Sequence, residues 1–205
     1  KVLREANPHC RIILVEPLVK IHADSYTDDA HLLNMNEYQY QAMDIIAGRI
    51  CPELGGEESY LDILGFNYYW NCQWHGASET LPWPESYPRR TPLSRLLEEA
   101  YHRYQKPMFL SETGHFGCGR VPWLNEVTDE CIKAIKNGVA LHGICIYPVT
   151  DRPDWDDLSS YSNCGIWDLD ASGNRIPEDD VIQAIKENQE KVCQSSQSLF
   201  RQIII

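Results

Sequence analysis

A carboxylate stands at the end of a short apolar run in the middle of this chain. Residues 106–114 read KPMFLSETG, so the apolar run ends at Ser111 and is followed at once by Glu112. Folds built from parallel strands place their active sites at the carboxyl ends of those strands, where a glutamate can act as a nucleophile or a proton-transfer group. The alternative is that Glu112 is a loop residue that caps the next helix, and this stretch alone does not decide between the two.

Two other segments combine aromatic, amide and carboxylate side chains in a similar way. Residues 64–70 read LGFNYYW, and residues 145–157 read CIYPVTDRPDWDD, followed by GIWD at 165–168. A sugar ring stacks its C–H faces on aromatic rings while its hydroxyl groups hydrogen-bond to carboxylates and amides. The three segments together therefore favour carbohydrate chemistry.

The elements that must position these residues alternate between strand and helix. Nearly continuous apolar runs at 11–16, 61–69, 107–111 and 143–149 are typical of strands buried on both faces of a parallel sheet. Helical patterns fall at 35–50, 93–104 and 121–137, and from 177 toward 192, with Thr91 as N-cap and Pro92 as first residue of the second helix. This order predicts an α/β fold with parallel pairing and right-handed crossovers.

The three strand ends resemble, in order, the last three strand ends of family 1 glycoside hydrolases, the β-glucosidase family of retaining (β/α)8 barrels. Residues 63–69 (ILGFNYY) are similar to the family's F-L-G-x-N-Y-Y, residues 111–114 (SETG) to its T-E-N-G, and residues 151–155 (DRPDW) to its D-N-F-E-W. The segment GIWD at 165–168 resembles the family's G-L-x-x-x-D. Thr113, Tyr147 and Asp154 depart from the family's Asn, Trp and Glu, which indicates altered sugar selectivity.

The resemblance implies a role for each matching residue. Glu112 would be the nucleophile, and Tyr69, or its neighbour Tyr68, would hydrogen-bond to its carboxylate and keep it ionised. The substrate-binding residues would be Asn67, Tyr68, Tyr147, Asp151, Asp154 and Trp155. Ordinary packing at the end of a barrel is the alternative for the aromatic members of this set. We expect no cofactor and no metal, since the chain has no Cys-x-x-Cys pair and no other ligand cluster.

The family's acid/base, which lies in an N-E-P motif at the end of the fourth strand, has no counterpart here. Val15-Glu16-Pro17 is similar, but only one apolar run separates it from the run that ends at Glu112, so Glu16 would end strand five. The chain therefore resembles strands five to eight of the barrel, a half barrel over residues 1–192, with a tail of unknown role at 193–205. Because an open sheet exposes its edges, we expect an N-terminal half barrel as partner, or self-association.

Two functions remain open at this stage. The first is a retaining β-glycosidase-like hydrolase, or its C-terminal half, with Glu112 as nucleophile and the acid/base outside this chain. The second is a non-catalytic carbohydrate-binding or interaction module derived from such an enzyme. A flavodoxin-like domain is disfavoured, because no glycine-rich phosphate loop follows the first apolar run.

Composition excludes several other classes of protein. The net charge of -12 and the pI near 4.9 argue against a nucleic-acid partner. No apolar run is long enough to predict a membrane span. Eight cysteines in a chain of 205 residues, without an apolar leader at the first residues, predict reduced thiols and a cytoplasmic location.

Overall fold

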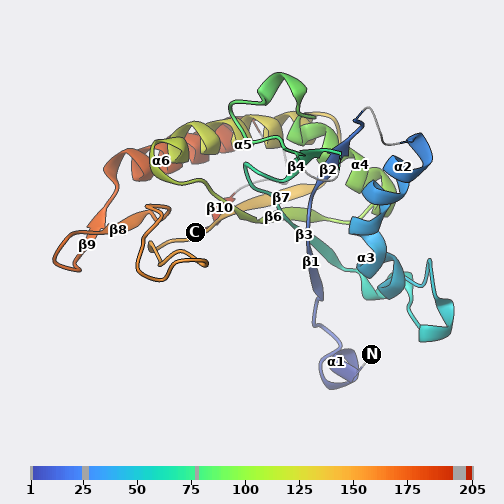
Figure 1. The fold of residues 1–205 in the computed structure, drawn as a ribbon. Coiled ribbons are helices and arrows are strands. Elements are labelled where there is room, and N and C mark those ends of the chain that lie inside the picture. Colours follow the sequence, from blue (N-terminus) through green and yellow to red (C-terminus); the bar gives the residue numbers. More distant parts are fainter. Residues whose placement is uncertain (1, 25–27, 77–78, 196–201, 205) are drawn as a thin grey trace.

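A computed structural model describes the chain except for residues 1, 25–27, 77–78, 196–201 and 205. Its centre is a parallel five-stranded sheet in the order β1-β3-β6-β7-β10 (Figure 1). The strands are β1 (Ile13–Pro17), β3 (Ile63–Asn67), β6 (Met108–Thr113), β7 (Leu141–Ile146) and β10 (Gln202–Ile204). The first four confirm the predicted apolar runs and their parallel pairing, with ends that move by a few residues.

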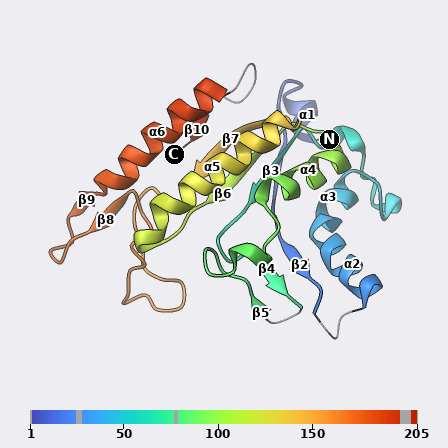
Figure 2. The same ribbon diagram turned by 90° about the horizontal axis from the view of Figure 1, so that it is seen from above.

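Three long helices cover one face of this sheet. They are α4 (Leu93–Tyr104), α5 (Arg120–Lys136) and α6 (Asp179–Ser195). They lie above the strands in the view of Figure 1 and side by side in the view of Figure 2. The face of α5 that meets the sheet is buried, with Trp123 2 % and Val127 1 % exposed. The helix ends ahead of Gly138, whose φ of 96° is a left-handed conformation that glycine adopts at little cost.

The start of α4 differs from the sequence prediction. Pro92 occupies the N-cap position rather than the first turn, and its side chain makes no capping hydrogen bond. The cap comes instead from α5, because the Glu130 carboxylate accepts from the Ser94 backbone N–H at 3.1 Å and from the Ser94 hydroxyl at 2.6 Å. A buried carboxylate at a helix N-terminus replaces the missing local cap and ties the two helices together.

The predicted helix at 35–50 is interrupted. The structure has α2 (Asp29–Glu37), a 3-10 turn η1 (Tyr38–Tyr40) and α3 (Gln41–Ile46) in its place. The Asp28 side chain accepts from the His31 N–H and caps α2, so this helical segment begins before the predicted boundary. The remaining short helices are α1 (Val2–Ala6), η2 (Pro52–Leu54), η3 (Glu58–Tyr60), η4 (Tyr87–Arg89) and η5 (Gly117–Gly119).

Short strands that the sequence pattern did not reveal extend the carboxyl end of the sheet. β2 (Lys20–His22) pairs in parallel with β4 (Gln73–His75), and β4 pairs with β5 (Glu79–Thr80). A separate hairpin joins β8 (Trp167–Leu169) to β9 (Arg175–Pro177). The β2-β4-β5 sheet lies beyond the carboxyl ends of β1 and β3, since β2 follows β1 and β4 follows β3 in the chain.

The hydrophobic core lies between the sheet and its helices. Leu64, Phe66 and Leu110 of the strands and Leu97 of α4 are 0 % or 1 % exposed, each worth about 1.5–3 kcal/mol of burial. The other face of the sheet is less covered, and Val15 on β1 is 40 % exposed.

Candidate active site

Glu112 and Tyr69 are joined by a hydrogen bond across two neighbouring strand ends. The Tyr69 hydroxyl donates to Oε2 of Glu112 at 2.9 Å, because β3 and β6 run in parallel and end together. Burial, and then the adjacent Glu112 carboxylate, raise the pKa of Tyr69 well above its ordinary value. The phenol therefore keeps its proton at neutral pH and remains a donor to the carboxylate.

The chain after β7 comes into contact with the chain after β6 at Gly114. A Cβ atom at this position would lie 2.2 Å from the backbone oxygen of Tyr147, so only glycine lets the chain after β6 approach the chain after β7 this closely. The Tyr147 backbone N–H also donates to the oxygen of Thr113 at 2.9 Å. These contacts hold the backbone at Tyr147 against the end of β6.

A cleft of about 690 Å³ opens at these strand ends. It brings together five of the predicted site residues, which come from three different strand ends: Tyr69, Glu112, Tyr147, Asp154 and Trp155. The sequence analysis assigned no role to the other main contributors, which are Trp70, Asn71, His115, Phe116, Arg152 and Asp156. A concave surface that mixes aromatic rings, carboxylates and amides suits a polar ring-shaped ligand.

The long segment after β7 presents Asp154 and Trp155 to the cleft. The Asp154 carboxylate accepts from the Asp156 N–H at 2.9 Å and from the Ser162 hydroxyl at 3.1 Å. The first of these bonds and then the second lower the pKa of Asp154, which keeps it ionised at neutral pH. Trp155 is 77 % exposed, and its ring centroid lies 4.8 Å from the guanidinium carbon of Arg152. The arginine therefore orients an otherwise solvent-exposed ring.

Asn67 and Asp151 do not line this cleft. The Asn67 side-chain oxygen accepts from the Ser111 hydroxyl at 2.7 Å, which joins β3 to β6 just below Glu112. Asp151 is 1 % exposed, and its carboxylate accepts from the Cys164 backbone N–H at 3.1 Å. In this arrangement Asp151 stabilises the loop that carries Asp154 and Trp155.

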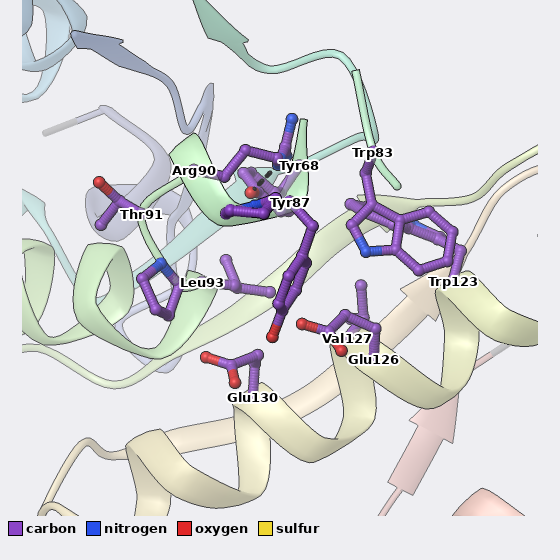
Figure 3. A pocket seen from close by; sticks show the side chains of 12 residues that line it. Tyr68, Trp83, Tyr87, Arg90, Thr91, Leu93, Trp123, Glu126, Val127 and Glu130 are labelled. Atoms are coloured by element: carbon purple, nitrogen blue, oxygen red, sulfur yellow. Dashed lines mark hydrogen bonds between the residues drawn. The ribbon is translucent and has the colours of Figure 1, made fainter. Parts of the chain in front are cut away.

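Tyr68 faces the helix layer, on the side of the sheet opposite Tyr69. Its ring stacks on Trp123 with centroids 5.7 Å apart, and its hydroxyl accepts from Arg90 at 2.8 Å. Tyr68 and Trp123 line a separate hollow of about 220 Å³, together with Trp83, Glu126 and other side chains of this layer (Figure 3). Successive residues of an extended segment point to opposite faces, so only one of the two tyrosines can approach Glu112.

Thr113, one of the departures from the family motif, also belongs to the helix layer. It is 1 % exposed, and its hydroxyl accepts from the Trp123 indole N–H at 2.9 Å. Arg152 and His115 carried a weak signal in the sequence, since each stands within three residues of a predicted site residue. Nothing in the sequence pattern alone indicated that these two side chains turn toward the cleft.

Parallel strands, covering helices and a cleft at the strand ends define half of a TIM-type (β/α) barrel, and comparison with solved structures agrees. The chain is similar to a β-glucosidase from Thermotoga maritima in complex with noeuromycin, with a TM-score of 0.65 and 17% identity over 91% of this chain. It is also similar to a family 1 β-glucosidase from the same organism (TM-score 0.63, 17% identity, 91% of this chain) and to a hyperthermophilic β-glucosidase mutant (TM-score 0.63, 17% identity, 83% of this chain).

The chain spans about half the length of these enzymes, since it covers 52%, 53% and 42% of their respective chains. No protein-family model and no curated protein sequence matches it. At this identity the likeness establishes the half-barrel fold, as predicted. Among the described residues, no helix is long and apolar enough to cross a bilayer.

Proposed function

We propose that this chain is the C-terminal half of a retaining β-glycosidase-like hydrolase, with Glu112 as its nucleophile. The observation that carries the proposal is the 2.9 Å hydrogen bond from Tyr69 to Glu112 in an aromatic cleft at the strand ends. A carboxylate oriented by a hydrogen bond from a neutral phenol is suited to attack an electron-poor carbon. The fold shared with β-glucosidases makes the anomeric carbon of a sugar the reasonable target.

In the first step, an oxygen of the Glu112 carboxylate forms a bond to the anomeric carbon. The bond between that carbon and the aglycone oxygen breaks, and the departing oxygen takes a proton from a second carboxyl group. Water then attacks the anomeric carbon from the face that the aglycone left, and the second carboxylate takes a proton from this water. The bond between the carbon and Glu112 breaks, which restores Glu112 and releases the sugar with retention. Asp154, Trp155 and Tyr147 would bind and orient the ring during both steps.

The second carboxyl group is the part that we place outside this chain. Retaining enzymes hold their two carboxyl groups about 5 Å apart. The other carboxylates that line the cleft, Asp154 and Asp156, belong to the sugar-facing loop, and the hydrogen bonds that lower the pKa of Asp154 make it a poor proton donor. We therefore propose an N-terminal half barrel as partner and expect this chain alone to turn over unactivated glycosides little. The cytoplasmic location stays a prediction from cysteine usage.

A fluorinated substrate tests the nucleophile without the missing acid. A 2-deoxy-2-fluoro-β-glucoside with a dinitrophenolate leaving group needs a nucleophile but little protonation, so incubation should give a stable adduct that intact mass and peptide mapping place on Glu112. The Glu112→Gln variant should form no adduct. Glu16→Gln is the matched control, since Glu16 also lies near the end of a strand, β1, and should leave labelling unchanged. Labelling that persists in Glu112→Gln would overturn the assignment.

A carbohydrate-binding module without catalysis is the second candidate. The exposure of Trp155 favours it, because exposed aromatic rings provide stacking platforms for sugars. Titration with cellobiose, followed by tryptophan fluorescence, separates the two functions. If saturable binding is equal in the wild type and in Glu112→Gln, and neither forms an adduct, the chain is a binding module.

A further inference from the structure

The last described strand covers one edge of the sheet. β10 pairs in parallel with β7 in the register Gln202 to Gly143, Ile203 to Ile144 and Ile204 to Cys145. It lies on the side of β7 that β6 does not occupy, after α6 has crossed back over the sheet (Figure 1). Residues 202–204, which belong to the tail of unknown role, thus form a fifth strand of the sheet, and β7 is paired on both sides.

The other edge of the sheet, at β1, has no strand beside it among the described residues. The oxygen of Ile12 accepts from the Ile63 N–H, and the Leu18 N–H donates to the oxygen of Asn67. Because backbone groups of successive strand residues point to opposite sides, the odd-numbered residues, Val15 among them, turn their N–H and C=O groups to the free edge. This edge is therefore available to another parallel strand over most of its length.

The number of strands in the sheet suggests which association β10 prevents. Without it the sheet would contain four strands, β1, β3, β6 and β7, with β1 and β7 as its two edges. Two copies joined so that β7 of each lies beside β1 of the other would contain eight parallel strands, the number that closes a barrel of this type. While β10 occupies β7, this closure is blocked.

We propose that β10 covers the edge of β7 and so prevents two copies of the chain from closing into one eight-stranded barrel. The occupant that it excludes is β1 of a second copy. The unpaired N–H and C=O groups along an exposed strand edge favour pairing with another chain, and covering such an edge suppresses this pairing. The proposal rests on the sheet itself and is independent of whether Glu112 performs catalysis. An N-terminal half barrel would need the same β7 edge, so it would have to displace β10 to close a barrel with this chain.

The test removes the β10 pairing without shortening the chain. In this part of β7 the odd-numbered residues, Tyr147 among them, turn their backbone groups to β6, so those of Ile144 face β10. The parallel register of Ile144 with Ile203 then directs the N–H of the next residue, Ile204, toward β7. Proline at Ile204 removes this N–H, so Ile204→Pro should release β10, while Ile204→Val is the matched control. Hydrogen exchange of the Ile144 amide should accelerate by about tenfold or more in Ile204→Pro at low protein concentration. At higher concentration, light scattering should show monomers for the wild type and Ile204→Val, and dimers for Ile204→Pro.

A second substitution identifies the docking edge. Val15→Pro removes an N–H that faces the free edge of β1 and leaves the pairing with β3 intact, so the double variant should keep the fast β7 exchange but remain monomeric. Slow exchange of Leu64 and Phe66 in β3 verifies that each variant is folded. Unchanged exchange of the Ile144 amide in Ile204→Pro would overturn the edge-covering role. Fast exchange without dimers, or dimers of the wild type, would overturn the block on association.

Discussion

Arg120 holds the loop that carries Asp154 and Trp155, and its removal offers a sharp test of how that loop is held. The guanidinium donates to the oxygen of Gly165 and to the Asp168 carboxylate, each at 2.8 Å, to the oxygen of Gly117 at 3.0 Å and to Glu178 at 3.2 Å. The Arg120 and Asp168 side chains are only 12% and 11% exposed. One arginine thus joins the start of α5, the end of the loop and the β8-β9 hairpin.

Arg120→Met should be among the more damaging single changes in this chain. It leaves the buried Asp168 carboxylate without its cation, and Oδ1 of Asp168 already has no hydrogen-bond partner among the described residues. Removing one partner of a buried ion pair costs about 3–5 kcal/mol, against a total stability of about 5–15 kcal/mol for a typical domain. With an m-value of about 2 kcal/mol/M, the urea midpoint should fall by about 1.5–2.5 M.

Urea unfolding followed by circular dichroism measures this difference. The double variant Arg120→Met with Asp168→Asn should recover about 1–2 kcal/mol of the loss, because it removes the uncompensated charge. Arg152→Met is the matched control, because Arg152 lies in the loop that Arg120 holds. Its guanidinium stacks on Trp155 at the surface, so the cost should stay below about 1 kcal/mol. A loss for Arg120→Met no larger than that for Arg152→Met, or a double variant no more stable than Arg120→Met, would refute the reasoning.

Three further changes probe the site and its support. Tyr69→Phe removes the hydrogen bond to the candidate nucleophile, worth about 1.5–3 kcal/mol, and should slow labelling by the fluorinated glycoside roughly tenfold to a hundredfold in a mass-spectrometric time course, whereas an unchanged rate would argue against its orienting role. Trp155→Ala should change the unfolding free energy by less than about 0.5 kcal/mol yet weaken cellobiose binding severalfold in a fluorescence titration, so unaltered binding would remove Trp155 from the site. Burial raises the pKa of Glu130, but the hydrogen bonds from Lys133 and Ser94 outweigh it and lower the pKa overall, so its stabilisation is present above the ordinary carboxylate pKa and is lost as the pH falls through the lowered one. Glu130→Gln should accordingly flatten the fall of unfolding free energy toward acid pH, and equal slopes for the two proteins would contradict this.

The sequence was sufficient for the framework of the half barrel and for the residues nearest its strand ends. Long apolar runs form buried strands wherever they are placed in a parallel sheet, and helices with a continuous apolar face have one way to pack on it, so β1, β3, β6, β7, α4 and α5 follow closely from local patterns. Because parallel strands end on the same side, the positions of Glu112, Tyr69 and Tyr147 near one cleft followed as well.

Other features depend on partners that are distant in the chain. The sequence left the choice between Tyr68 and Tyr69 open, because a period of two separates adjacent tyrosines onto opposite faces but does not say which face meets the helices. The short strand β10 and the cap of α4 by Glu130 form only through long-range contacts. Segments this short carry too little periodicity to be recognised, since their stability comes from the neighbouring strand or helix rather than from their own residues.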